Sequence, residues 1–231
     1  MQPKKTRTYH VMIPKLLHQT YKNNDIPDLY KYCASELRIL HPDYEYCFYT
    51  DAKMMDIMET EFPDYVAEFN RLPRMIMKID MFRYFLMYKY GGIYADMDYL
   101  FMNSFPYPTA KIVLPASREE NGVITRLGNC VFASEAGHPF WKMLMDTLFL
   151  FDRTLLDYED DAIVDGHSQG TGPVFVTEMW KRYADRESIL VPPRDLFHPP
   201  TKVDQTYVNG LRESGTIGMH FCSGLWRENR L

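Results

Sequence analysis

The chain has 231 residues, of which 46% are hydrophobic and 15% aromatic, and these values predict a single folded domain, residues 1–231, with a sizeable core. A formal net charge of −5 without a clustered basic stretch argues against nucleic acid as a partner, because binding phosphates needs a basic surface. No apolar run reaches the roughly 18 residues that span a membrane, and no secretory signal core is visible. We therefore expect no membrane span in this chain, and we expect either a cytoplasmic protein or a soluble catalytic domain.

Up to residue 90 the hydrophobic pattern switches between the two-residue period of strands and the 3.6-residue period of helices. The most informative helix pattern ends at Gly91 and Gly92, which can adopt the left-handed conformation of a helix C-cap. Asp51 is placed to cap the N-terminus of the helix that follows it. In chain order, the predicted elements are a strand at 11–17, a helix at 25–41, a strand at 44–50, and helices at 52–62 and 75–90.

A strand-like segment, GGIYADMDY, carries two acids one position apart, Asp96 and Asp98. Side chains at i and i+2 of a strand point to the same side, so the two carboxylates repel each other unless a cation lies between them. Hard oxygen ligands of this kind suit Mg²⁺ or Mn²⁺. The pair alone is a weak signal, because an exposed strand end with two solvated acids has the same pattern.

Upstream, the segment KIDMFRY places Asp80 and Arg83 three residues apart, on one face of the predicted 75–90 helix. An exposed pair with this spacing adds only about 0.2 to 0.5 kcal/mol of stability. The surrounding helix is largely apolar, however, and a buried acid and a buried arginine each need a partner. We therefore expect both side chains to be partly buried.

The second half of the chain also alternates strand-like and helical segments, which predicts an α/β fold with a mostly parallel or mixed sheet. Strands are expected at 111–116, 129–134, 188–193 and 216–221, and helices at about 139–151 and 173–186. The acidic stretch at 152–170 is typical of a long loop. No C-x-x-C pair occurs, so reduced, partly buried thiols are expected at Cys33, Cys47, Cys130 and Cys222.

Four features of this half have both a structural and a functional interpretation. Asn129 is either a turn residue or a group in an active site. The turn at 170–172 either starts a helix, with Thr171 as its N-cap, or offers backbone N–H groups to a polar ligand. His220 is either a strand-end histidine or a ligand, and Trp226 is either a core aromatic or part of a site.

The ordered combination of these motifs resembles one family. The string D-x-x-R-Y followed by Y-G-G-I-Y-A-D-x-D is similar to the glycosyltransferases that have a sugar-binding D-x-D region, a family that includes initiating α-1,6-mannosyltransferases and mannosyl-inositol-phosphorylceramide synthases. The blocks IPKLLHQTYKNNDIP, HPDYEYCFYTD, GHPFW and GTGPVFVTEMWKRY occur in the family's order, from about Ile13 to Trp226. This agreement is far more specific than D-x-D alone.

The resemblance implies a GT-A glycosyltransferase fold, in which helices flank a Rossmann-like nucleotide-binding sheet. It also implies a metal-dependent enzyme, with Mn²⁺ or Mg²⁺ as cofactor. Such an enzyme moves a hexose, with retention of configuration, from a nucleotide-sugar donor to a hydroxyl of a glycan or glycolipid acceptor. Mannose from GDP-mannose is the expected donor, with a UDP-sugar as the other candidate, and we expect a monomer or weak oligomer.

Carried over residue by residue, the family's pattern places Asp98 on the metal and Asp96 on the donor and, through water, on the metal. Asp80 and Arg83 would bind the donor sugar, and Asn129 would orient the acceptor or the anomeric centre. Further donor-binding positions in this pattern are Ile13, His18, Gln19, Thr20, Tyr94, Gly170, Thr171, Gly172 and Trp226. His220 is a further candidate metal ligand.

Two other interpretations stay open from the residues. Haloacid-dehalogenase-type phosphatases also use D-x-D, with the first Asp as nucleophile, but they place Thr or Val where this chain has Leu100. The other is a non-catalytic sugar-binding module, because the family closes with a histidine followed by Ser-Trp, whereas here Leu225 precedes Trp226. Ser223 is a candidate replacement for that serine hydroxyl.

Overall fold

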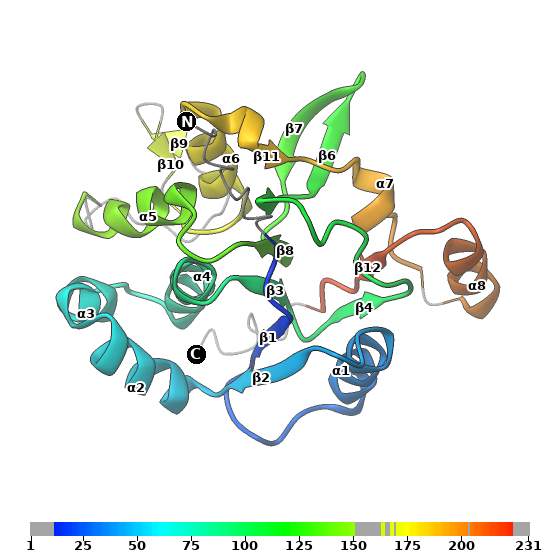
Figure 1. Cartoon of the computed structure of the whole chain (residues 1–231), viewed down its shortest axis with the longest axis horizontal. Coiled ribbons are helices and arrows are strands. Elements are labelled where there is room, and N and C mark those ends of the chain that lie inside the picture. Colours follow the sequence, from blue (N-terminus) through cyan, green and yellow to red (C-terminus); the bar gives the residue numbers. More distant parts are fainter. Residues whose placement is uncertain (1–11, 151–162, 165–166, 169, 203, 224–231) are drawn as a thin grey trace, which may run out of the picture.

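A computed structural model describes residues 12–150, 163–164, 167–168, 170–202 and 204–223 (Figure 1). Its centre is a six-stranded sheet in the order β11-β5-β8-β3-β1-β2. The strands are β1 (Leu16–Thr20), β2 (Glu45–Tyr49), β3 (Gly92–Ala95), β5 (Ile112–Val113), β8 (Val131–Ser134) and β11 (Ile189–Leu190). Parallel pairs join β1 to β2 and β3, and β5 to β11, while β8 runs antiparallel between β3 and β5. The sheet is therefore mixed, one of the two arrangements predicted.

Helices lie on both sides of this sheet (Figure 1). The helices are α1 (Asp28–Leu40), α2 (Asp51–Glu61), α3 (Pro63–Asn70), α4 (Met75–Lys89), α5 (Pro139–Asp146), α6 (Pro173–Arg182), α7 (Arg194–Phe197) and α8 (Gln205–Glu213), with 3₁₀ turns η1 (Thr147–Phe149) and η2 (Arg186–Ser188). Among the described residues, none of the helices combines the length and the apolar character needed to cross a membrane.

Alternate strand residues enter different hydrophobic cores. Tyr94 and Phe132 belong to the core that contains α4 and α5, whereas Ile93 and Val131 belong to the core that contains Leu37 of α1. This is the two-residue period of strands covered on both faces. The sheet is therefore enclosed in the middle of the molecule, and its strand ends are left to carry polar groups.

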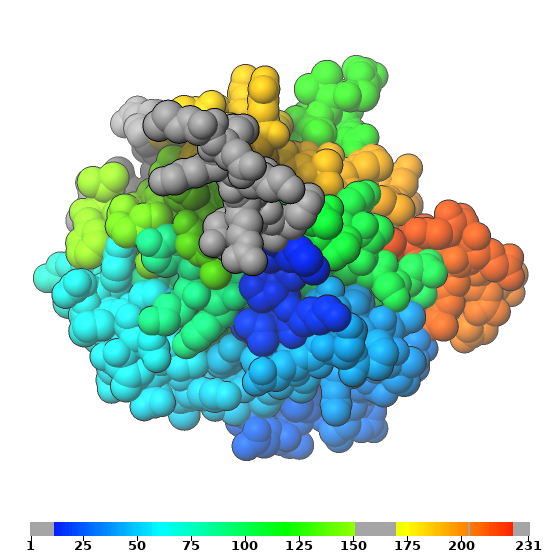
Figure 2. All heavy atoms as spheres, in the orientation of Figure 1, coloured from blue at the N-terminus to red at the C-terminus, as the bar shows by residue number. Residues whose placement is uncertain are grey.

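Three two-stranded pairs complete the described fold: β4 (Tyr99–Phe101) with β12 (Gly218–His220), β6 (Ala116–Glu120) with β7 (Val123–Leu127), and β9 (Ile163–Val164) with β10 (His167–Ser168). The β6–β7 hairpin and α8 project from the edge of the molecule in the space-filling view (Figure 2). The β4–β12 pair matters most for the site, because its antiparallel register sets His220 opposite Tyr99.

The first predicted elements differ from the structure in their boundaries. The strand expected at 11–17 begins only at Leu16, because Pro14 cannot donate a ladder hydrogen bond, and it continues to Thr20. Asp51 was expected to cap α2, but it is the first helical residue, and the hydroxyl of Thr50 accepts the hydrogen bond from the Lys53 N–H instead.

Later boundaries also differ. Helix α5 ends at Asp146 and passes into a 3₁₀ turn rather than continuing to residue 151, and α6 ends at Arg182 rather than 186 because the next residue is extended. The stretch expected as a loop at 152–170 contains the short strands β9 and β10, and most of its other residues lie outside the described part. All four cysteines are free thiols, as predicted, but Cys222 is exposed rather than partly buried.

Candidate active site

The segment from residue 92 to 101 forms two strands separated by a turn, not one strand. Strand β3 ends at Ala95 and β4 begins at Tyr99, whose N–H donates to the carbonyl of Asp96 across 3.0 Å. The turn is required because β3 and β4 belong to different sheets. The expectation that strand alternation brings Asp96 and Asp98 together was therefore wrong; the turn does so.

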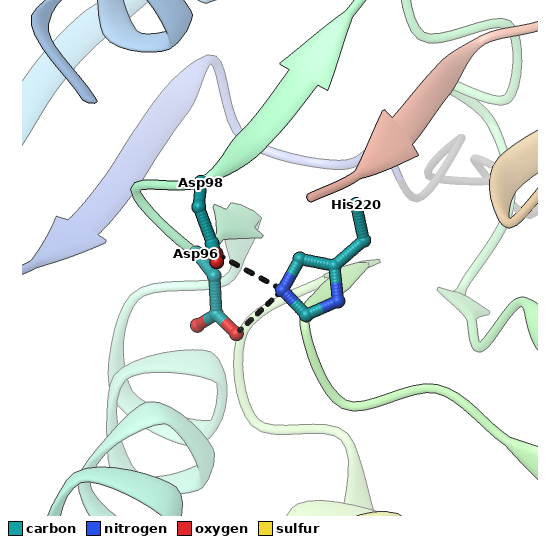
Figure 3. Close-up of side chains that lie close together, drawn as sticks. All are labelled: Asp96, Asp98 and His220. Atoms are coloured by element: carbon teal, nitrogen blue, oxygen red, sulfur yellow. Dashed lines mark hydrogen bonds and ion pairs between the residues drawn. The ribbon is translucent and has the colours of Figure 1, made fainter. Parts of the chain in front are cut away.

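His220 completes a cluster with the two acids (Figure 3). Its Nε2 lies 2.9 Å from Oδ1 of Asp98 and 4.0 Å from Oδ2 of Asp96, and one ligand atom from each of the three residues lies within 4.8 Å of the others. The side chains of Asp96 and His220 are about a quarter exposed, at 24% and 23%, so a ligand can reach them. Two carboxylates and one imidazole form a ligand set suited to a divalent cation.

The charges within this cluster are balanced by hydrogen bonds. Burial by itself raises the pKa of Asp98, but the contacts with His220 and Ser223 outweigh it and lower the pKa to about 2. Burial by itself lowers the pKa of His220, yet the neighbouring Cys130 and Asp98 raise it well above its ordinary value. In the absence of a cation, a protonated imidazole therefore neutralises part of the acidic pair.

Ser223, the candidate replacement for the family's serine hydroxyl, contacts Asp98. Its backbone N–H and its hydroxyl both donate to Oδ2 of Asp98, across 2.9 and 2.7 Å, and the Phe221 N–H donates to the Asp98 carbonyl. A serine hydroxyl thus reaches the D-x-D acid from a position three residues after His220. Leu225 and Trp226 lie outside the described residues.

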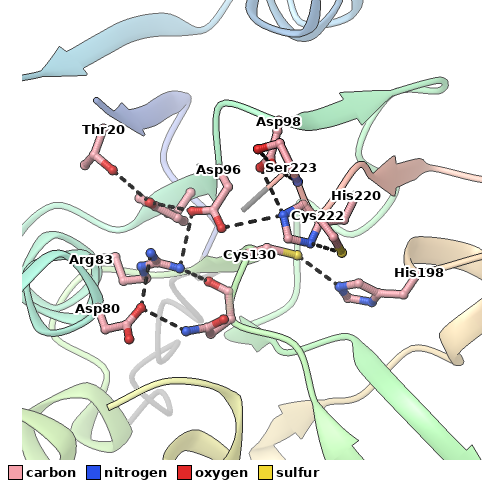
Figure 4. A network of polar contacts seen from close by, with 12 residues as sticks. Thr20, Asp80, Arg83, Asp96, Asp98, Cys130, His198, His220, Cys222 and Ser223 are labelled. Carbon is pink, nitrogen blue, oxygen red and sulfur yellow. Dashed lines mark hydrogen bonds and ion pairs between the residues drawn. The ribbon is translucent and has the colours of Figure 1, made fainter. Parts of the chain in front are cut away.

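Arg83 is the centre of a second, enclosed polar network (Figure 4). Its guanidinium lies 3.2 Å from Oδ1 of Asp80 and 3.3 Å from Oδ1 of Asp96, donates to the Asn129 carbonyl across 2.5 Å, and stacks 4.7 Å from the centroid of the Tyr94 ring. The side chain of Arg83 is only 3% exposed and that of Asp80 only 7%. The predicted burial of this pair is confirmed.

Burial and neighbouring charges act in opposite directions on Arg83 and on Asp96. Burial alone would lower the pKa of Arg83, but Asp96 and Asp80 raise it above its usual range. Burial raises the pKa of Asp96, and the charges of Arg83 and His220 only partly oppose that rise. Asp96 is therefore an acid whose charge depends on the cations around it.

Asp80 is held by three side chains. Its Oδ1 accepts from Asn129 Nδ2 as well as Arg83, and its Oδ2 accepts from the Thr171 hydroxyl across 3.0 Å. The Tyr84 hydroxyl, one turn further along α4, donates to the Thr171 carbonyl across 2.6 Å. Thr171 was a predicted N-cap, but the N-cap of α6 is Gly172, because the Thr171 hydroxyl is engaged with Asp80.

The first strand contributes two of its predicted residues to this network. The Thr20 hydroxyl lies 3.0 Å from the Tyr94 hydroxyl, which donates to Oδ1 of Asp96 across 2.8 Å, and Gln19 Nε2 donates to the Asp96 carbonyl. His18 lies apart from them, between the Tyr49 hydroxyl and the Gly91 carbonyl. The Ile13 side chain packs in the core that contains Leu37 and Phe197.

Two cysteines and a histidine near the cluster were not predicted as site residues. Cys130 Sγ lies 3.2 Å from His198 Nε2, and Cys222 Sγ lies 3.2 Å from Nδ1 of His220 (Figure 4). Nothing in the spacing of the sequence joins Cys130 to His198, since 68 positions separate them. Cys222 and Ser223 had a local signal, their proximity to His220.

Comparison with known proteins agrees with this geometry. Residues 27–117 match a family model described as "Glycosyltransferase sugar-binding region containing DXD motif". The chain is 33% identical over 171 residues to "Inositol phosphoceramide mannosyltransferase 3" of Schizosaccharomyces pombe, covering 74% of this chain and 46% of that protein. It is 31% identical to "Mannosyl phosphorylinositol ceramide synthase SUR1" of Saccharomyces cerevisiae, covering 74% of this chain and 43% of that protein. The chain thus spans less than half the length of these relatives.

Among solved structures, the chain resembles one titled "PaToxG Glycosyltransferase", with a TM-score of 0.54 and 15% sequence identity, over 88% of this chain and 75% of that one. At this identity the likeness establishes the fold alone. It confirms the α/β GT-A fold expected from the sequence.

Proposed function

Because the chain belongs to the glycosyltransferases that share a sugar-binding region with a DXD motif, we propose that it transfers a hexose from a nucleotide sugar to a hydroxyl of a glycan or glycolipid acceptor. The names of the similar yeast proteins favour mannose as the sugar, and we propose GDP-mannose as the donor, with a UDP-sugar as the other candidate. Residues 1–231 would act as one catalytic domain.

The observation that supports this proposal most strongly is the convergence of Asp96, Asp98 and His220 at the end of β3. These residues would hold Mn²⁺ or Mg²⁺, since their oxygen and imidazole donors fit such an ion. A bound divalent cation would supply positive charge opposite the diphosphate leaving group. Because metal ligation needs a neutral imidazole, His220 would release its proton when the ion binds.

The remaining residues would orient the donor. Asp80, fixed by Arg83, Asn129 and Thr171, is the carboxylate we assign to the donor sugar's hydroxyls. Arg83 contacts both acids, so beside binding the donor sugar we assign it the task of holding Asp80 and Asp96 in register. Preorganised charges of this kind need no rearrangement during the reaction.

We propose that transfer proceeds with retention of configuration, by attack of the acceptor on the face that the diphosphate leaves. No protein nucleophile is needed in this scheme. The leaving phosphate oxygen accepts the proton of the acceptor hydroxyl, and the protein positions the two substrates.

The decisive experiment is a thermal-shift panel of GDP- and UDP-sugars, each with and without Mn²⁺, followed by a transfer assay with the donor that binds. A bound donor raises the melting temperature because it stabilises the folded state by RT ln(1 + [L]/Kd). We expect one donor to raise the melting temperature only when Mn²⁺ is present. The Asp98→Asn variant should show neither this Mn²⁺-dependent shift nor transfer activity. Asp56→Asn, on the exposed surface of α2, is the matched control and should behave as wild type.

Two outcomes would contradict the proposal. A donor shift without transfer or donor hydrolysis across a broad acceptor panel would indicate a sugar-binding module. Full Mn²⁺-dependent activity in Asp98→Asn would remove the metal assignment.

A further inference from the structure

A buried tyrosine of α1 reaches the residues that hold Asp98. Tyr30 is 6% exposed, and its hydroxyl lies 2.5 Å from the hydroxyl of Ser223, which is 193 positions away in the chain. Its ring packs with Ala34 and with Met97, the residue between the two acids of the D-x-D motif. Tyr30 therefore contacts both the turn that carries the acids and the segment that follows His220.

The direction of these hydrogen bonds follows from the number of protons available. Oδ2 of Asp98 accepts from the Ser223 backbone N–H, and a carboxylate oxygen has no proton to donate in return. The single proton of the Ser223 hydroxyl is therefore donated to Oδ2 of Asp98. The contact between Ser223 and Tyr30 must then be made by the phenolic proton of Tyr30.

Burial keeps that phenolic proton in place. It raises the pKa of Tyr30 to about 12, so the hydroxyl remains a donor throughout the neutral range. The result is a chain of two directed hydrogen bonds, from Tyr30 to Ser223 and from Ser223 to Asp98. Because Tyr30 engages a lone pair of the Ser223 oxygen, it adds a second restraint that favours the rotamer facing Asp98.

We propose that Tyr30 is a positioning residue of the metal site, whose hydroxyl orients Ser223 and, through it, the carboxylate of Asp98. The inference rests on the proposed function, because it needs Asp98 to be a metal ligand. Hydrogen-bond partners behind a ligating carboxylate fix its orientation and so raise the affinity for the ion. Oδ1 of Asp98 faces His220 on the side where the ion would lie, whereas Ser223 and Tyr30 support Asp98 through Oδ2.

The test is a double-mutant cycle on Mn²⁺ affinity, measured by isothermal titration calorimetry with no donor or acceptor present. Tyr30→Phe removes the hydroxyl and keeps the packing ring, and Ser223→Ala removes the intermediate hydroxyl. We expect each variant to bind Mn²⁺ about 10-fold more weakly than wild type. Because Tyr30 acts only through Ser223, the double variant should bind as weakly as Ser223→Ala alone. Tyr32→Phe, on the exposed side of the same helix, is the matched control and should bind as wild type.

Packing and positioning give different outcomes in this cycle. Wild-type affinity in Tyr30→Phe overturns the proposal, and so does a further 10-fold loss when Tyr30→Phe is added to Ser223→Ala, since the two hydroxyls would then act independently. Failure of the wild-type protein to bind Mn²⁺ overturns the metal site itself and this inference with it. If wild type binds Mn²⁺ and the losses of affinity in Tyr30→Phe and Ser223→Ala add up in the double variant, the role of Tyr30 is overturned and the proposed function stays intact.

Discussion

Arg83 illustrates how much one enclosed side chain can organise. A planar guanidinium presents donors in several directions at once, and here they serve Asp80, Asp96 and the Asn129 carbonyl. The three acceptors come from a helix, a turn and a loop, so Arg83 joins parts of the chain that are distant in sequence. The relative positions of Asp80 and Asp96 depend on this one group.

Replacing Arg83 by lysine keeps the positive charge but should still lower both stability and activity. One ammonium cannot reach all three acceptors, and a buried carboxylate left without its partner is destabilising. We expect Arg83→Lys to lose at least about 2 kcal/mol of unfolding free energy in urea denaturation, and transfer to fall more than about 10-fold. Arg71→Lys, in an exposed pair with Glu68, is the control and should change stability by less than about 0.5 kcal/mol. Wild-type stability in Arg83→Lys would mean that a different group holds Asp80.

At this scale the sequence predicted contacts between side chains where the signal was local. The spacing of Asp80 and Arg83 on an apolar helix predicted their burial, which the structure confirms. The contacts of Tyr30 and His198 could not be predicted, because each joins residues far apart in the chain. The sequence pattern does not distinguish a tyrosine that only packs in the core from one whose hydroxyl also orients a residue of a site.

Among the elements, α4 and β3 form the unit that aligns the two halves of the site. Helix α4 carries Asp80 and Arg83, and the chain turns through Gly91 and Gly92 directly into β3, which ends beside Asp96. Both glycines have positive φ angles, 64° and 95°. A short connection between helix and strand leaves little freedom in how the two are placed.

Gly92→Ala should disturb this connection strongly. A Cβ at that position would lie 2.7 Å from the Leu16 carbonyl oxygen of β1, and the φ of 95° is strained for any residue with a side chain. We expect a loss of at least about 2 kcal/mol in urea denaturation. Gly210→Ala, inside α8 with open space around it, should instead be neutral or stabilising by up to about 1 kcal/mol. Equal stability of the two variants would contradict this account of the turn.

Helix and strand patterns predicted most elements but misread the D-x-D segment as one strand. Residues 92–101 have the apolar composition of a continuous strand, and composition does not reveal that β3 pairs with β1 and β8 while β4 pairs with β12. The choice of sheet is a tertiary property. The convergence of the two acids was predicted correctly, although the local structure was not.

At the scale of the whole molecule, buried neutral histidines link folding to pH. Burial lowers the pKa of His18 to about 4 and that of His198 to about 4, from an ordinary value of 6.5. Between pH 6.5 and 4 the unfolded chain binds protons at these positions and the folded chain does not. Stability is therefore full above about pH 6.5 and decreases as the pH falls towards 4.

Each such histidine should contribute a slope of about 1.4 kcal/mol per pH unit in that window. His18→Gln keeps an amide that can bond the Gly91 carbonyl but cannot titrate. We expect urea denaturation at several pH values to show a shallower acid slope for His18→Gln than for wild type, by about that amount. Identical slopes would show that His18 is protonated in the folded protein.

The pairing of β4 with β12 makes the acidic cluster depend on a contact between distant parts of the chain. Asp98 and His220 are 122 positions apart, so a nascent chain can complete most of the central sheet while its acidic turn still lacks the imidazole and Ser223. Closing that long loop joins the acids to their counter-charge only after residues 218–223 have emerged from the ribosome. The three candidate ligands therefore come together only when β12 pairs with β4.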